Sequence, residues 1–175
     1  MRQHILLALI FLTMGNAQAA DHGNEQNIKA AVVTAHPLAS QVGKEIIAAG
    51  GNAFDAAVAV SLALAVVEPY GSGLGGGGFW LLHSAADQQD VMFDGREVAP
   101  LAAHPNLYRN ADGSISNDSV NGPRAAGIPG MLAALELISQ RYGRLPWQQV
   151  VLPAVALAEE GFIPHARYLK YLKMR

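Results

Sequence analysis

One arginine, Arg96, is a candidate binding group because it ends a short apolar segment that follows a glycine-rich stretch. The planar guanidinium of arginine donates parallel hydrogen bonds and therefore suits the recognition of a carboxylate. Six of the eight residues from Gly71 to Gly78 are glycine, which leaves room for a backbone or a ligand to approach closely. The alternative is a structural arginine that forms a salt bridge to Glu97 or Asp94. The residues alone leave both roles open.

The glycine stretch also satisfies the spacing of a dinucleotide-binding loop, G-x-G-x-x-G, through Gly71, Gly73 and Gly76. That motif needs a strand before it and a helix after it, so that the pyrophosphate meets a helix N-terminus. Here an alanine-rich helix is predicted before the glycines and a strand after them. The sequence therefore favours a tight helix-to-strand connection, which lets a buried helix lie against a sheet.

No complete catalytic or metal-binding motif accompanies these residues. The patterns C-x-x-C, H-E-x-x-H, G-x-S-x-G and the EF-hand loop do not occur, and the chain has no cysteine. The histidines beyond residue 20 stand singly and are predicted to be surface or turn residues rather than metal ligands. They are His22, His36, His83, His104 and His165. We therefore expect neither a metal nor a cofactor.

Residues 1–19 are expected to form a secretory signal peptide. Arg2 supplies the positive region, Ile5–Leu12 the apolar core and Ala17–Ala19 a small-x-small cleavage site. The apolar run is far shorter than the roughly 20 residues that cross a bilayer. Cleavage after Ala19 changes the formal charge from 12 − 14 = −2 to 11 − 14 = −3, which argues against a nucleic-acid partner. The expected location is the periplasm or the exterior of the cell.

The segment before the glycine stretch is predicted to contain one strand and two helices. Ala31–Ala35 is a short apolar run typical of a buried strand. Pro37 then begins a helix with one apolar face, which ends at a pair of glycines. Asn52 and Asp55 form an approximate capping box. The helix that they open, Ala53–Val67, is apolar on every side and is therefore expected to be buried.

The segment after the glycine stretch is predicted to contain two strands and then helices. Phe79–His83 and Val91–Glu97 are the strands, joined by a polar turn. An irregular segment leads to a helix whose apolar stripe runs from Met131 to Tyr142. A further helix is predicted from residue 145 to 160, with a break or kink at Pro153. Hydrophobic residues make up 51% of the chain and charged residues 15%, which indicates a globular protein of mixed α/β (α+β) class.

Seven segments resemble the gamma-glutamyltranspeptidase (glutathione hydrolase) family and occur in the family's order. They are TAHPLAS (34–40), GGNAFDAAVA (50–59), VEP (67–69), SGLGGGGF (72–79), DGREVAP (94–100), IPG (128–130) and PA (153–154). The resemblance implies a four-layered αββα N-terminal-nucleophile hydrolase fold, of which residues 20–175 would be a truncated N-terminal portion of the large subunit. The family's precursor cuts itself into two subunits, and the new N-terminal threonine of the small subunit is the nucleophile.

The resemblance also implies an activity, partners and a role for Arg96. The family transfers the gamma-glutamyl group of glutathione to water or to amino acids, and its arginine at the position of Arg96 grips the substrate's α-carboxylate. The nucleophilic threonine would lie outside this chain, since Thr34 falls in a predicted strand without an autocleavage block. The implied partners are glutathione or another gamma-glutamyl compound, the rest of the large subunit and the small subunit. The chain alone is then expected to be inactive.

Two alternatives remain open at this point. The same scaffold could serve a related acyl substrate, such as a poly-glutamate or a cephalosporin side chain. The chain could also be a secreted, non-catalytic remnant. A reading frame that continues into a threonine-led small subunit would exclude the remnant, and a substrate panel would separate the two enzymes.

Overall fold

The computed structural model describes residues 30–174. The predicted signal peptide, residues 1–19, lies outside the described residues. The chain divides into residues 1–31 and 32–175, and all helices and strands below belong to the second unit. Within the described range, no helix combines the length and the apolar character needed to cross a membrane.

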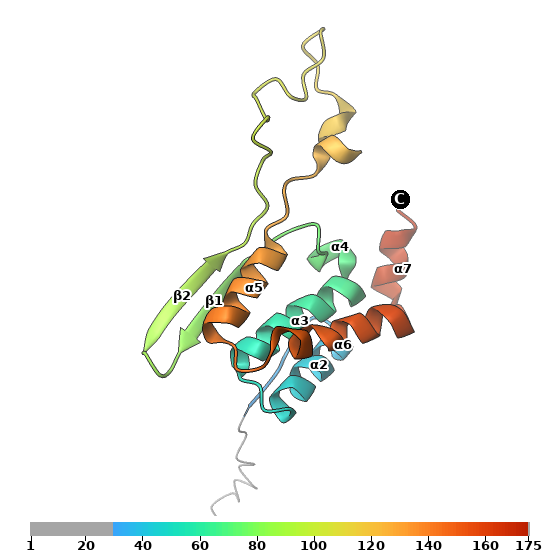
Figure 1. Ribbon diagram of the computed structural model, residues 1–175. Coiled ribbons are helices and arrows are strands. Elements are labelled where there is room, and N and C mark those ends of the chain that lie inside the picture. The colour runs from blue at the N-terminus through green and yellow to red at the C-terminus, as the bar shows by residue number, and fades with distance from the viewer. Residues whose placement is uncertain (1–29, 175) are drawn as a thin grey trace, which may run out of the picture. The chain divides into compact units, whose positions relative to one another are not determined.

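Helix α3 (Ala53–Val67) is the central element and packs against α2 (Pro37–Ala48), α5 (Met131–Tyr142) and α6 (Trp147–Glu160) (Figure 1). Small and apolar side chains on all sides of α3 allow this close approach from several directions. Its buried apolar residues are Ala56, Val58, Ala59, Leu62, Ala63, Ala65 and Val67. The predicted buried helix and its capping box are both confirmed.

The sheet of the described part is a single antiparallel hairpin, β1 (Phe79–Ser84) and β2 (Gln89–Asp94) (Figure 1). Its inner face packs into the core through Trp80, Leu82, Val91 and Phe93. The Trp80 indole N–H donates to Ser61 Oγ of α3 at 3.1 Å. The outer face is also apolar but exposed, at Phe79, Leu81 and Met92. Apolar residues on both faces of a strand are typical of a sheet that is covered on both sides.

Shorter elements complete the described part. The four-residue α4 (Pro69–Ser72) follows α3 at once, and α7 (Ala166–Leu172) follows α6. Between β2 and α5, an excursion that carries η1 (Asn117–Ser119) and η2 (Pro123–Ala125) leaves and returns at a bridge between Val98 and Ile128. The excursion matches the predicted irregular segment.

One prediction about regular structure is wrong, and of the two alternatives for Pro153 one is excluded. Residues 31–35 do not form a strand, and Val33 is 92% exposed. A strand needs a hydrogen-bonding neighbour, and β1 and β2 pair only with each other in the described part. Of the break or kink predicted at Pro153, the break is absent, because α6 continues through this residue. Proline deprives the Gln149 carbonyl of its helical partner, but Gln149 is exposed and water can replace that bond.

Candidate functional site

A cavity of about 310 Å³ lies where the glycine stretch meets the residues after β2. Arg96 and Glu97 form one side, and α4 with the following glycines forms the rest. The lining residues are Pro69, Tyr70, Gly71, Ser72, Gly73, Gly75, Gly76, Gly77, Arg96 and Glu97. Strand β2 ends at Asp94 rather than at the predicted Glu97, so Arg96 lies two residues beyond the strand.

Glycines hold the backbone of Gly95 and Arg96 between two other segments. A Cβ on Gly77 would overlap the Gly95 carbonyl and lie 2.7 Å from Arg96 Cα. A Cβ on Gly130, at the start of α5, would lie 2.6 Å from the same carbonyl. Real side chains do not tolerate such contacts. Gly77 and Gly130 therefore confine the backbone of Arg96. The predicted order of helix, glycine stretch and strand is confirmed, with the short helix α4 between the helix and the glycines.

The Arg96 side chain is half-exposed and pairs with its neighbour. Its Nη2 lies 2.8 Å from Glu97 Oε1, and its backbone N–H donates to Asp94 Oδ1 at 3.0 Å. The internal salt bridge considered from the sequence is thus present with Glu97, while Asp94 contacts only the Arg96 backbone. A guanidinium has five N–H donors, so this one bond to Glu97 leaves others able to bind a carboxylate.

Glu97 packs against the end of the excursion, at Gly127. A Cβ on Gly127 would lie 3.1 Å from both Cβ and Cγ of Glu97. Its Oε2 is buried and has no hydrogen-bond partner among the described residues. Because Oε1 is bonded to Arg96 and Oε2 is enclosed, Glu97 is placed to orient the guanidinium.

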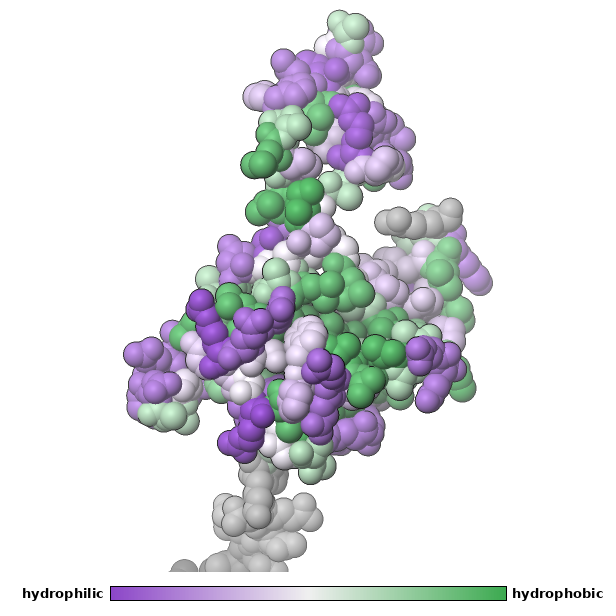
Figure 2. Space-filling view, in the orientation of Figure 1, coloured by the Kyte–Doolittle hydropathy of each residue, from purple (hydrophilic) through white to green (hydrophobic). Residues whose placement is uncertain are grey.

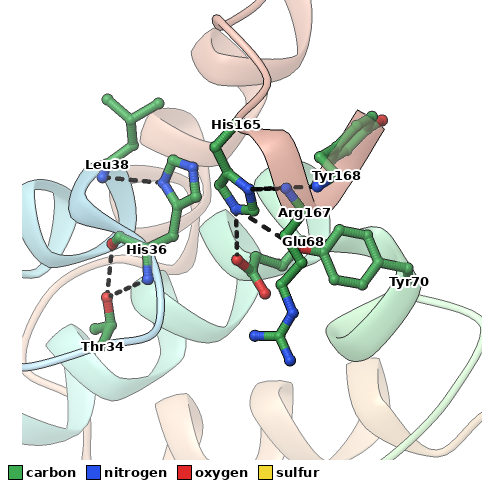
Figure 3. Close-up of polar contacts among 8 residues, drawn as sticks. All are labelled: Thr34, His36, Leu38, Glu68, Tyr70, His165, Arg167 and Tyr168. Carbon is green, nitrogen blue, oxygen red and sulfur yellow. Dashed lines mark hydrogen bonds and ion pairs between the residues drawn. The ribbon is translucent and has the colours of Figure 1, made fainter. Parts of the chain in front are cut away.

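A second polar cluster lies on the other side of α4 and was missed by sequence reasoning. His36, Glu68 and His165 meet there, with Tyr70 beside them (Figure 3). His165 Nε2 lies 3.0 Å from Glu68 Oε1, and the two imidazole rings stack with their centroids 5.3 Å apart. His36 is only 5% exposed, and its ring lies against that of His165, so these two histidines are not isolated. His36 still lies at a bend and His165 is partly exposed, in agreement with the predicted turn or surface positions. The only local signal was the position of each histidine immediately before a helix.

The surroundings of this cluster shift two pKa values downward. Burial lowers the pKa of His36, the neighbouring His165 lowers it further, and Glu68 opposes both. Burial by itself raises the pKa of Glu68, but the polar hydrogens of His165 and Tyr70 and the charge of Arg167 together outweigh it. The pKa of Glu68 therefore lies below its ordinary value.

The described part assembles no group of metal ligands, and its threonine, Thr34, lies in a local turn. Within residues 30–174, no three histidine or acidic side chains converge as metal ligands. Thr34 is not in a strand as predicted, and its hydroxyl closes the turn before α2, at 2.7 Å from the His36 carbonyl and 2.8 Å from Ser40 Oγ. The Thr34 hydroxyl is therefore engaged in local hydrogen bonds at the start of α2.

Comparisons with known proteins agree with one another. The family model for gamma-glutamyltranspeptidase matches residues 39–175. A glutathione hydrolase proenzyme from Pseudomonas sp. (strain A14) is 41% identical over 160 residues, which are 91% of this chain and 28% of that protein. The crystal structure of Helicobacter pylori gamma-glutamyltranspeptidase superposes with a TM-score of 0.79 and 40% identity, over 83% of this chain and 42% of that one. The crystal structure of cephalosporin acylase from Bacillus halodurans superposes with a TM-score of 0.70 and 32% identity, over 79% of this chain and 25% of that one.

These likenesses confirm the predicted fold class, a mixed α/β part of an N-terminal-nucleophile hydrolase fold. The chain spans less than a third of the length of the curated relative and less than half of the solved chain. The family match covers nearly all described residues, including the glycine stretch and Arg96. The chain belongs to the gamma-glutamyltranspeptidase family.

Proposed function

We propose that the complete protein is a gamma-glutamyltransferase and glutathione hydrolase, which transfers the gamma-glutamyl group of glutathione to water or an amino acid. The observation that carries this proposal is the glycine-lined cavity in which Glu97 orients Arg96. A gamma-glutamyl compound presents an α-carboxylate far from the reacting carbonyl, and a fixed guanidinium suits the binding of that carboxylate. The nucleophilic threonine comes from the part of the protein outside this chain.

The apolar surface of the chain supports partners from the rest of the protein. The outer face of the hairpin exposes Phe79, Leu81 and Met92. Figure 2 shows further apolar surface over α5 and α6, where Leu132, Leu152 and Val155 are exposed. Contiguous exposed apolar surface marks interaction sites. We propose that the remaining large subunit and the small subunit cover these faces.

One observation favours a second candidate, a related acylase. The chain is 32% identical to cephalosporin acylase in the region that it shares with that structure. An α-carboxylate clamp suits gamma-glutamyl donors, whereas an acylase need not hold that group. Turnover of a gamma-glutamyl donor and of a cephalosporin side chain by the same preparation separates the two candidates.

The complete protein is expected to hydrolyse a chromogenic gamma-glutamyl anilide, and the 175-residue chain is expected not to. Covalent catalysis needs a nucleophile activated by a nearby base, and the hydroxyl of Thr34 is committed to its turn. The assay compares both proteins after purification from a host that lacks the enzyme. Turnover by the short chain contradicts the assignment of the nucleophile, and inactivity of both proteins favours the non-catalytic remnant.

We further propose that the protein is exported to the periplasm or the exterior. The support is the arrangement of Arg2, the apolar run Ile5–Leu12 and the small residues Ala17–Ala19. Intact-mass measurement of the exported protein is expected to show cleavage after Ala19. An exported form that still carries Met1 would overturn the proposal.

A further inference from the structure

Glycine has an evident structural reason at most of its positions in the described part. At four of them, φ lies between 80° and 93°, in the left-handed region that other residues rarely adopt. At eight more, an added Cβ would lie 3.1 Å or less from a neighbouring atom. Gly71 and Gly75 have neither reason, because their φ angles are not left-handed and an added Cβ would have no described heavy atom within 4 Å apart from the adjoining backbone. Both residues line the Arg96 cavity.

The local backbone also gives no reason for glycine at these two positions. Gly71 lies inside the short helix α4, where glycine is less stable than alanine. Gly75 lies in the turn that the Gly76 N–H closes by donating to the Gly73 carbonyl at 3.1 Å. Most residues are compatible with such a turn where φ is negative, as it is at Gly75. Within the described part, glycine at Gly71 and Gly75 therefore lowers stability without relieving a steric contact.

Polar groups border the open space beside these two exposed glycines. The Arg96 guanidinium binds Glu97 through Nη2 and has further N–H donors. An apolar segment placed in the cavity would leave those donors buried without partners, which costs free energy. A carboxylate would satisfy them. The cavity therefore suits a small anionic ligand better than an apolar segment from the rest of the protein.

We propose that Gly71 and Gly75 are specificity-determining residues of the Arg96 cavity, whose missing side chains leave the space for the α-amino acid end of a gamma-glutamyl donor. A methyl group at either position would occupy part of the cavity beside the α-carboxylate. The two glycines thus set the size of the group that the cavity admits, while Arg96 selects its charge. This inference rests on the proposed function, in which Arg96 binds the α-carboxylate of the donor.

The variants Gly71→Ala and Gly75→Ala of the complete protein test binding and stability together. Each is expected to raise KM for a chromogenic gamma-glutamyl anilide about tenfold or more, since one added carbon in a filled pocket has an effect of that size. Titration calorimetry with L-glutamate is expected to show a matching loss of affinity without any turnover. The thermal midpoint is expected to stay equal or to rise, because alanine loses less conformational entropy on folding than glycine.

A donor analogue without the α-carboxylate provides a second comparison. Its smaller end leaves room for the added methyl group. The increase in KM caused by Gly71→Ala or Gly75→Ala is therefore expected to be smaller for the analogue than for the gamma-glutamyl anilide.

Two glycines of the same stretch provide matched controls. Gly78 does not line the cavity, and an added Cβ would make only ordinary contacts with Trp80, at 3.6–3.9 Å. Gly78→Ala is therefore expected to bind the donor like wild type. A Cβ on Gly77 would overlap the Gly95 carbonyl, so Gly77→Ala is expected to lower the thermal midpoint. A purely structural role of Gly71 or Gly75 would give the same loss of stability as Gly77→Ala.

Wild-type KM and wild-type affinity for L-glutamate in both cavity variants would overturn the inference. A thermal midpoint lowered as in Gly77→Ala, or failure of the precursor to cut itself, would also overturn it, because another segment of the protein would then need the space. Turnover by the wild type tests the proposed function separately. A wild type that binds L-glutamate without turnover contradicts the proposed function, while the comparison of affinities still tests the glycines. A wild type that neither turns over the anilide nor binds L-glutamate overturns both.

Discussion

Arg96→Ala in the complete enzyme is expected to weaken substrate or transition-state binding by on the order of 2–5 kcal/mol, the range for removing one partner of a buried charge pair. Gly77 and Gly130 confine the backbone around Arg96, and Glu97 binds Nη2 of its guanidinium. Such fixation lowers the cost of ordering the donors when a carboxylate binds. Arg96→Lys is expected to restore only part of the loss, because lysine keeps the charge without the planar fork.

A substrate analogue without the α-carboxylate turns this comparison into a double cycle. The penalty for Arg96→Ala should shrink sharply with the analogue, since wild type then gains nothing from the arginine. Arg124→Ala is the matched control, because Arg124 is equally exposed and pairs with Asp118 at 3.1 Å, outside the cavity lining. Steady-state kcat/KM for each enzyme and substrate provides the free energies. An equal penalty on both substrates would show that Arg96 is only the structural partner of Glu97.

Local sequence signals predicted the elements that depend on neighbouring residues. Asn52 and Asp55 are three residues apart, and their capping box formed as expected. The uniformly apolar Ala53–Val67 became the central helix, and the hairpin placed Arg96 near the glycines. The position of Arg96 was predictable because few residues separate it from β2, and because several adjacent glycines indicate close backbone contact.

The features that the sequence did not reveal depend on distant contacts. Glu68 and His165 are 97 residues apart, and nothing in either neighbourhood indicates that α7 brings them together. Ala31–Ala35 has the composition of a strand, but strand formation depends on a neighbour that the described part does not supply. The opposite case is Pro153, where the continuing packing of α6 against α3 outweighed a local helix-breaking residue.

Asp55 combines a local and a distant role, and we therefore expect its replacement to have a large effect on stability. Its carboxylate is fully buried and accepts from the Asn52 N–H at 2.9 Å within the capping box. It also accepts from the backbone N–H groups of Arg144 and Leu145, at 3.0–3.1 and 3.3 Å, which lie in the connection between α5 and α6. A Cβ on Gly143 would lie 2.7 Å from Asp55 Oδ1, so only glycine leaves room for this approach. One side chain thus joins the start of α3 to two other core helices.

Asp55→Ala is therefore expected to lower the free energy of unfolding by about 3–5 kcal/mol. Hydrogen bonds to a charged group contribute about 1.5–3 kcal/mol each, and the backbone N–H groups that bind Asp55 would lose their acceptor. Asp55→Asn retains an acceptor and should lose roughly half as much. The control Asp90→Ala removes a carboxylate that is 75% exposed and, among residues 30–174, pairs with His83 alone, so a change below about 1 kcal/mol is expected. Urea unfolding of the chain measures all three, and with a slope of about 1–3 kcal/mol per molar the Asp55→Ala midpoint should shift by about 1 M or more. A midpoint for Asp55→Ala that matches Asp90→Ala would mean that α3, α5 and α6 hold together through apolar packing alone, without the carboxylate between them.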